Sequence, residues 1–469
     1  MINKKVAIEV LNEALATGAD FAEIFFEDSN SRSVMIENGK VDSSSSNSTT
    51  GVGLRLLKEN QCVYGYTTDL SKKGLLKLAA TLNKSFHGER ILTVNKLDMI
   101  RVKNRNPIKR SYNDVPREEI IELLRNGVDE LQKLNEPKIV RSEFGFAYNH
   151  RCVAVFNSKE KWFKRDTEFA RLFVSVIAAD ETGFETGFEG PGRQGGDISY
   201  FKEQIDIRAI TRNVVRIALQ NLGAKECPSG VMPVIVGNGW GGVLFHESCG
   251  HPLEASAVSR GLSCFSGKEG EMIASPLVSA IDDSTIPGEW GSIDIDDEGN
   301  PGEKRLLIKN GKLVNFMIDD YNGRRMGRSG NGACRRQNYK YTPTSRMSNT
   351  YICAGKSTPE EIIKATKLGL YTKGFNGGSV DPATGEFNFG CSEAYIIRDG
   401  KICEPVRGAS LIGSGAQVLM NIDMVGNDLE RAQGMCGAAS GSIPTDVGQP
   451  TIRVRDILVG GNGGELKWN

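Results

Sequence analysis

The stretch VMPVIVGNGWGGVLFHESCGHPLEAS, residues 231–256, places two overlapping motifs at a single strand-to-helix junction. The apolar run at 231–236 predicts a buried strand, and the residues from Val243 onward predict a helix. Glycines at 237, 239 and 242 lie between them, and the helix carries the segment HESCGH at 246–251. One motif is typical of a nucleotide site and the other of a metal site, so the surrounding sequence has to separate them.

The glycines at 237–242 match GxGxxG, a dinucleotide-binding fingerprint, in its usual strand-to-helix setting. Such a unit also needs a second parallel strand soon after the helix, ending in an acid about 20 residues beyond the glycines. Here residues 256–271 read SAVSRGLSCFSGKEGE, which is small, polar and interrupted by glycine. A nucleotide-binding enzyme is therefore the least favoured alternative.

His246, Glu247 and His251 form an HExxxH motif. Two imidazoles are good zinc ligands, and the adjacent Glu can accept a proton from a water molecule that the metal activates. In a regular helix a spacing of five residues separates the two imidazoles by about 140°, whereas a spacing of four separates them by about 40°. A single wide turn with i to i+5 hydrogen bonding would bring both to the same side, and Gly250 and Pro252 suit such a distortion.

A catalytic zinc site commonly has three protein ligands and a water, so a third ligand is required. Cys249 is close in sequence, but three ligands within six residues would need severe distortion. Cys436 is a distant thiol between Gly434 and Gly437, where missing side chains would let the backbone approach a metal. The residues alone leave the choice open between Cys436, Cys249 and a distant carboxylate.

The composition of the chain excludes several classes of protein. The 58 Lys and Arg balance the 58 Asp and Glu, so there is no basic excess to hold nucleic acid or an acidic membrane. No 18 apolar residues follow one another, which argues against a membrane span. Ten cysteines without a CxxC pair indicate reduced thiols, and residues 1–20 do not form a signal peptide. We expect a cytoplasmic protein with no nucleic-acid or membrane partner.

Residues 1–227 are predicted to form an α+β domain of antiparallel meanders with flanking helices. Helical periodicity covers residues 4–17, 70–84, 116–134 and 207–222, with strand-like runs between the members of each pair. An Asn38-Gly39 turn predicts a tight hairpin. This order suggests a duplication with units at 1–90 and 110–225. The Gly-rich and acidic segment 182–197 is predicted to be a long mobile loop.

Residues 228–469 are predicted to form a second domain, Gly-rich and mostly antiparallel, that carries the metal-site helix. Of the 54 glycines, 38 lie in residues 230–469. Short strand-like runs alternate with turns such as Asn310-Gly311 and Asp399-Gly400. The one long helical pattern covers residues 358–370. The predicted fold class of the whole chain is therefore α+β.

Several ordered motifs of this second domain resemble the TldD/PmbA family of metallopeptidases. They are VIVGNGWGGVLFHESCGHPLEA (234–255), IDDEGNPGE (295–303), SRMSNTYI (345–352), SEAYIIRDGK (392–401), GASLIGSG (408–415), MVGND (424–428) and the run from GMCG to VGQPTIRV (434–454). The chain retains HExxxH and so resembles the catalytic, TldD-like branch. The resemblance implies zinc on His246, His251 and Cys436, with Glu247 as general base. Relatives more often have small apolar residues where this chain has Ser248-Cys249, and that second thiol leaves the third ligand open.

The resemblance further implies hydrolysis of short or unfolded peptides inside an enclosed dimer cavity. It also implies that catalytic members pair with a motif-free, PmbA-like subunit, so we expect either a homodimer or such a heterodimer. Two other functions stay open. One is a regulatory or binding protein that acts on a macromolecule, because older labels in the family name a modulator of DNA gyrase. The other is a nucleotide-binding enzyme that uses the glycines at 237–242.

Overall fold

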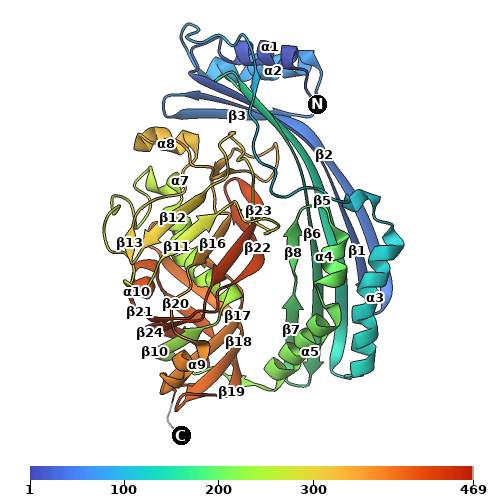
Figure 1. Cartoon of the computed structure of the whole chain (residues 1–469), viewed down its shortest axis with the longest axis vertical. Helices are drawn as coiled ribbons and strands as arrows, with labels where there is room; N and C mark the ends of the chain where they lie inside the picture. Colours follow the sequence, from blue (N-terminus) through green and yellow to red (C-terminus); the bar gives the residue numbers. More distant parts are fainter. Residues whose placement is uncertain (467–469) are drawn as a thin grey trace.

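A long curved sheet and a set of shorter, Gly-rich sheets make up the computed structural model of the chain, which describes residues 1–466 (Figure 1). The curved sheet and its helices come from the N-terminal half, and the shorter sheets come from the C-terminal half. The predicted α+β class is confirmed. The division into domains at residues 227/228 stays a prediction.

The curved sheet has the strand order β3-β2-β1-β5-β6-β4, with β7 and β8 also paired to β6. Its strands are β1 (Phe21–Glu37), β2 (Lys40–Lys58), β3 (Gln61–Thr67), β4 (Asp98–Met99), β5 (Ile139–Asn157), β6 (Lys161–Asp180), β7 (Gly183–Glu189) and β8 (Gly192–Gln194). β1 and β2 join through Asn38 and Gly39, both with positive φ, which confirms the predicted hairpin. β1 and β5 pair antiparallel, so the two meanders meet edge to edge.

Helices cover each end of this sheet. They are α1 (Lys4–Ala14), α2 (Lys72–Leu82), α3 (Arg117–Leu134), α4 (Ile198–Glu203) and α5 (Ile207–Gly223). α1 and α2 bury residues such as Leu11 against Leu54 of β2, whereas α3 to α5 bury residues such as Val214 against Phe146 of β5. The chain order of helix, meander and helix thus occurs twice. Whether it records a duplication stays a prediction.

The prediction of a mobile loop at 182–197 is wrong. β7 pairs along the whole end of β6, from Gly183 opposite Asp180 to Glu189 opposite Val174, and β8 pairs further along the same strand. The glycines serve packing here: a Cβ at Gly187 would lie 1.9 Å from the Val214 carbonyl oxygen of α5. Composition alone does not separate this close approach of a helix to a strand from backbone mobility.

The C-terminal half is mostly antiparallel, as predicted. One sheet has the order β17-β10-β24-β20-β18-β19-β9 with β21 on β24, a second has β13-β12-β11-β16-β23-β22, and β14 pairs with β15. The strands are β9 (Lys225–Glu226), β10 (Gly230–Val236), β11 (Ala280–Asp283), β12 (Lys304–Lys309), β13 (Lys312–Leu313), β14 (Cys334–Arg335), β15 (Thr344–Ser345), β16 (Asn349–Ile352), β17 (Leu368–Val380), β18 (Glu386–Arg398), β19 (Lys401–Arg407), β20 (Ser410–Ser414), β21 (Ile422–Val425), β22 (Glu430–Ala438), β23 (Gly441–Gln449) and β24 (Ile452–Gly460). Among the described strands of this half, only β9/β19, β10/β17 and β16/β23 pair in parallel.

Short helices connect these strands: α6 (Val243–Phe245), α7 (Ala255–Val258), α8 (Asp320–Met326), α9 (Pro359–Lys364) and α10 (Gly415–Met420). The predicted helix at 358–370 is therefore too long, because it ends at Lys364 and Leu368 begins β17. Leu370 is fully buried and pairs with Val234 of β10. Burial within a sheet overrides helical periodicity in these last residues.

The two halves join through a mixed apolar and ionic interface. Phe25, Val155 and Phe163 of the curved sheet pack with Ile295 and Tyr339 of the C-terminal half. Buried ion pairs add to it, with 2.7 Å between Arg55 and Glu298 and 2.6 Å between Arg336 and Glu23. None of the described helices is both long and apolar enough to cross a membrane.

Candidate metal centre

The glycine turn after β10 packs against protein. A Cβ at Gly242 would lie 2.3 Å from the Gly448 amide nitrogen of β23, and one at Gly241 would lie 2.6 Å from Gln449. Gln449 also donates to the Gly237 carbonyl over 3.1 Å. The strand that follows, β11, belongs to a different sheet from β10. The glycines thus allow the turn to pack closely against β23.

The helix after this turn contains the predicted wide turn. A 3-10 helix at Gly239–Gly242 and α6 lead into a π-helix at His246–Gly250, where the His251 amide donates to the His246 carbonyl. Two glycines make room for it: a Cβ at Gly250 would lie 2.3 Å from Met347 Sδ, and one at Gly415 would lie 1.8 Å from the Ser248 carbonyl oxygen. The i to i+5 hydrogen bond turns both histidines to the same side.

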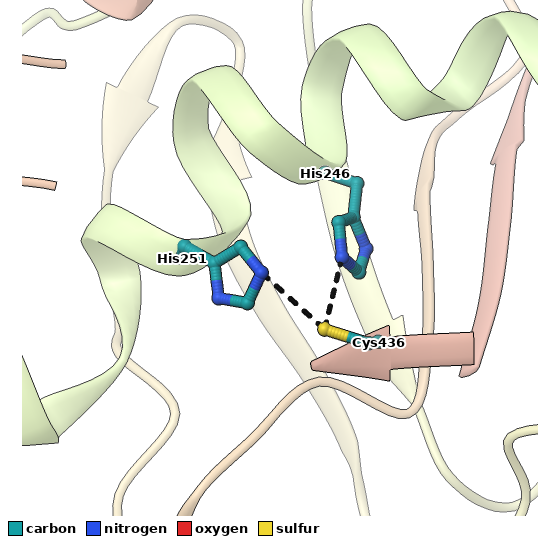
Figure 2. Close-up of side chains that lie close together, drawn as sticks. All are labelled: His246, His251 and Cys436. Atoms are coloured by element: carbon teal, nitrogen blue, oxygen red, sulfur yellow. Dashed lines mark hydrogen bonds between the residues drawn. The ribbon is translucent and has the colours of Figure 1, made fainter. Parts of the chain in front are cut away.

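His246, His251 and Cys436 converge in space (Figure 2). The Cys436 Sγ lies 3.3 Å from His246 Nε2 and 3.3 Å from His251 Nε2, and all three ligand atoms lie within 4.8 Å of one another. The histidines come from the π-turn and its end, whereas Cys436 comes from β22, an edge strand of its sheet. We call these three residues the HHC cluster.

The HHC cluster fits a tetrahedral metal such as zinc. Zn–N bonds of about 2.0 Å and Zn–S bonds of about 2.3 Å at tetrahedral angles require ligand atoms roughly 3.5 Å apart. The two nitrogen-to-sulfur distances of 3.3 Å match this requirement without rearrangement. Two imidazoles and a thiolate also suit zinc better than the hard cations magnesium or calcium.

The electrostatics of the HHC cluster favour the thiolate that a metal needs. Burial alone would raise the pKa of Cys436, but His246 and His251 hold it well below its usual range. Burial opposes the charged form of His251, yet Glu254 and the Cys436 thiolate raise its pKa well above the usual value. These surroundings favour the thiolate form of Cys436, which is the form that binds a metal.

Glu247 lies beside the cluster, with one carboxylate oxygen 4.0 Å from His251 Nε2. Burial raises the pKa of its carboxyl, while the nearby histidines partly offset that rise. The side chain borders two cavities that flank the HHC cluster. Its position suits a group that exchanges protons with a molecule bound there.

Two further residues hold the cluster in place. Glu254 faces His251 Nδ1 at 3.3 Å, an arrangement that orients an imidazole for metal binding. Arg346 is fully buried and donates to the Cys436 carbonyl at 2.5 Å, and its Nε lies 3.8 Å from Glu254. Neither role was predicted from the sequence, although Glu254 stands three residues after His251 and Arg346 lies in the SRMSNTYI motif.

The structure does not bring Cys249 into the cluster. Its side chain is fully buried in the core of the C-terminal half, and burial raises its pKa well above the usual value. The expected role of the glycines around Cys436, a close approach of the backbone to a metal, stays a prediction. A Cβ at Gly437 would meet no atom of residues 1–466 within 4 Å, and one at Gly434 would make ordinary contacts. The thiol reaches the histidines through its place on β22.

Two cavities meet at the HHC cluster, and both are bordered by His246, Glu247 and Cys436. One, of about 530 Å³, has apolar walls that include Trp240, Phe375 and Phe188 of β7. The other, of about 740 Å³, is bordered by polar groups such as Arg260, Glu254 and Tyr321. The cluster is therefore reachable from two sides.

Comparisons with known proteins identify relatives of the chain. Models of the PmbA/TldA metallopeptidase domain 1, central domain and C-terminal domain match residues 22–85, 110–222 and 229–461. A protein named metalloprotease TldD homolog from Buchnera aphidicola is 33% identical over 98% of this chain and 96% of its own length. A protein of the same name from Haemophilus influenzae is 35% identical over 94% of this chain and 93% of its own length.

A solved structure from Thermotoga maritima, described in connection with DNA gyrase modulation, has a TM-score of 0.76 at 20% identity. The alignment covers 94% of this chain and 96% of that one. At this identity the likeness shows the fold alone. The family models and the curated relatives go further, because together they span nearly the whole chain. The chain belongs to the PmbA/TldD family of metallopeptidases.

Proposed function

We propose that the chain is a zinc-dependent metallopeptidase that uses His246, His251 and Cys436 as ligands and Glu247 as general base. The observation that carries this proposal is the convergence of the three ligand atoms beside Glu247, where two cavities meet. The curated relatives named metalloprotease agree with it. So does the retained HExxxH sequence.

A zinc ion held by these three residues would supply Lewis acidity to the attacking water and to the scissile carbonyl. The Glu247 carboxylate accepts one proton from the water as its oxygen adds to the carbonyl carbon. When the C–N bond breaks, the same carboxyl returns this proton to the leaving amine. Glu254 and Arg346 hold His251 and Cys436 still during these steps, which limits reorganisation at the site.

We propose short or unfolded peptides as the substrates. A folded domain could not place a backbone carbonyl at atoms as buried as those of the HHC cluster, whereas a flexible chain can enter the flanking cavities. The cavity that contains Phe188 has walls from both halves of the molecule. A substrate there would contact the N-terminal sheet as well as the metal-site helix.

We also propose that the chain forms a dimer and is located in the cytoplasm. The family resemblance supports a dimer, either with a second copy or with a motif-free, PmbA-like subunit. Light scattering of the purified chain, alone and with such a subunit, would distinguish the two. All ten cysteines are free in the structure, which agrees with a reducing compartment such as the cytoplasm.

A second candidate is a regulatory protein that binds a macromolecular partner. The structural neighbour described in connection with DNA gyrase favours this alternative. A protein of this kind would act without hydrolysis, so the Glu247→Gln variant would keep its cellular role. Under the peptidase proposal the same variant fails in the cell.

The direct test measures zinc and peptide cleavage on the same preparations. Wild type should carry about one zinc per chain and lose activity to a chelator. Glu247→Gln should keep the metal, because the ligands are untouched, and cleave about 10²- to 10⁴-fold more slowly. Glu271→Gln, at an exposed position in the same half, is the matched control. Wild type that carries no zinc, or a Glu247→Gln variant that cleaves normally, contradicts the proposal.

A further inference from the structure

A third cavity, of about 310 Å³, lies between the curved sheet and the C-terminal half and is rich in arginine. Arg151 and Arg165 reach it from β5 and β6, and Arg335 and Arg336 reach it from the segment that begins at β14. Only two carboxylates, Glu27 and Asp297, are among its lining residues. Four guanidinium groups against two carboxylates leave the cavity with an excess of positive charge.

Both of these carboxylates are already paired. Glu27 accepts from Arg151 Nε over 2.9 Å, and Asp297 accepts from Arg165 over 2.7 Å. Arg336 has its own partner outside the cavity, because it donates to Glu23 over 2.6 Å. Two of the four arginines, Arg165 and Arg336, therefore pair across the two halves, and Arg151 pairs within the curved sheet. Arg335 has a different environment.

Arg335 has no carboxylate partner within 4.0 Å among residues 1–466. Its side chain is only 6% exposed, and the hydrogen bond that it makes within this range is a donation to the Met347 carbonyl over 2.7 Å. Burial and the nearby Arg346 lower its pKa to about 9. Asp297 and Asp282 attract this cation only from a longer distance. A buried cation without a directly paired counter-charge is costly, so its place beside a cavity favours an anionic ligand.

The arginine cavity adjoins the metal centre. Met435, the neighbour of Cys436 on β22, borders all three cavities and is half exposed. A second link runs through Met347, whose carbonyl accepts from Arg335 and whose sulfur packs beside Gly250 of the π-turn. A peptide with its scissile bond at the HHC cluster could pass Met435 and reach Arg335.

We infer that Arg335 binds a carboxylate of the substrate peptide and so selects peptides that carry an acidic group at a set distance from the cut. This inference rests on the proposed peptidase function. The guanidinium fork matches a carboxylate with two parallel hydrogen bonds, which gives position as well as affinity. The carboxylate is either the C-terminus of the peptide or an Asp or Glu side chain.

The test uses a random hexapeptide pool in two forms, one with free C-terminal carboxylates and one with C-terminal amides. Cleavage by wild type, Arg335→Gln and Arg335→Lys is followed by mass spectrometry. Arg328→Gln, at a surface arginine that pairs with Glu269, is the matched control. Binding of each pool to Glu247→Gln and to the Glu247→Gln/Arg335→Gln double variant is measured by calorimetry, so that recognition is tested without hydrolysis.

If the C-terminus is bound, wild type should cleave the free-acid pool at least tenfold faster than the amide pool, and Arg335→Gln should remove this preference. If a side chain is bound, both pools are cut alike but the cut peptides carry Asp or Glu at one fixed position, and that enrichment disappears in Arg335→Gln. Arg335→Lys keeps the positive charge but cannot make two parallel hydrogen bonds to a carboxylate, so it should retain part of the preference for acidic peptides.

A wild type that shows neither preference overturns the inference. An Arg335→Gln variant that slows all peptides equally overturns it as well, because that result indicates a purely structural arginine. If no pool is cut by wild type, the peptidase proposal fails. Calorimetry then still decides the inference, since carboxylate-dependent binding that is lost with Arg335 supports it and carboxylate-independent binding contradicts it.

Discussion

Two buried polar clusters of the C-terminal half differ in whether their polar atoms all have hydrogen-bond partners. In one, the Asp282 carboxylate accepts from Arg305, from the amide and hydroxyl of Ser348 and from the Thr350 hydroxyl. In the HHC cluster the two imidazoles and the thiol face one another. Nδ1 of His246 is buried and makes no hydrogen bond within residues 1–466.

The Asp282 cluster is a buried polar group that stabilises the fold, whereas the HHC cluster is a buried polar group suited to bind a ligand. Every oxygen lone pair around Asp282 has a donor, so the cluster offers nothing to a further group. The HHC cluster instead directs three electron-pair donors toward one region at tetrahedral spacing. Substitutions in the two clusters should therefore have separable consequences, metal content in one and free energy of unfolding in the other.

The largest effect is expected from Cys436→Ser. A hydroxyl is a poor zinc ligand at neutral pH, so zinc content should fall below about a tenth of an ion per chain and peptide cleavage should disappear with it. Cys249→Ser is the matched control, since that thiol is equally buried but lies outside the cluster. Metal analysis that finds zinc in Cys436→Ser and none in Cys249→Ser would reverse the ligand assignment.

The Asp282→Asn substitution should destabilise the fold and leave the metal in place. It leaves the fully buried Arg305 without a counter-charge, which costs about 3–5 kcal/mol of unfolding free energy. Urea unfolding measures this loss, and zinc analysis checks that the ion stays bound. Asp456→Asn on β24, an exposed position, should change stability by less than about 0.5 kcal/mol. Equal stability of the two variants would show that the Asp282 cluster has no such role.

The Asp282–Arg305 pair also predicts how the free energy of unfolding depends on pH. Burial alone would raise the pKa of Asp282, but Arg305 and the hydroxyl and amide donors hold it below its usual range. The stabilisation is then fully present above the unfolded pKa of about 3.9 and is lost as pH falls through the lower folded value. The stability gap between wild type and Asp282→Asn should be constant from about pH 5 to 8 and shrink below about pH 4.

The sequence predicts the two histidine ligands, which lie close together in the chain, better than the cysteine ligand, which lies far from them. The π-turn follows from the five-residue spacing of His246 and His251 with Gly250 between them, because helix geometry is a local property. Cys436 lies 185 residues beyond His251, and residue chemistry alone left it among several candidates. Only the family resemblance selected it.

Errors in the predicted fold have the same origin. Segment 182–197 has the composition of a loop, yet β6 and α5 hold it as paired strand. Residues 368–370 have helical periodicity, yet β10 and β18 draw them into a sheet. Arg335 gave no sequence signal that separated it from Arg336, because their difference depends on which carboxylates the folded chain places nearby.

The smallest expected effect tests whether the HHC cluster depends on residues that do not touch the metal. Glu254→Gln keeps an oxygen that can accept from His251 Nδ1 but removes the charge that faces both His251 and Arg346. Losing such an orienting carboxylate typically weakens metal binding about 10- to 100-fold. Competition with a chromophoric chelator measures the zinc affinity, and Glu271→Gln serves again as the exposed control. An unchanged affinity would mean that the π-turn and β22 alone position the ligands, as the complete hydrogen bonding around Asp282 positions that carboxylate.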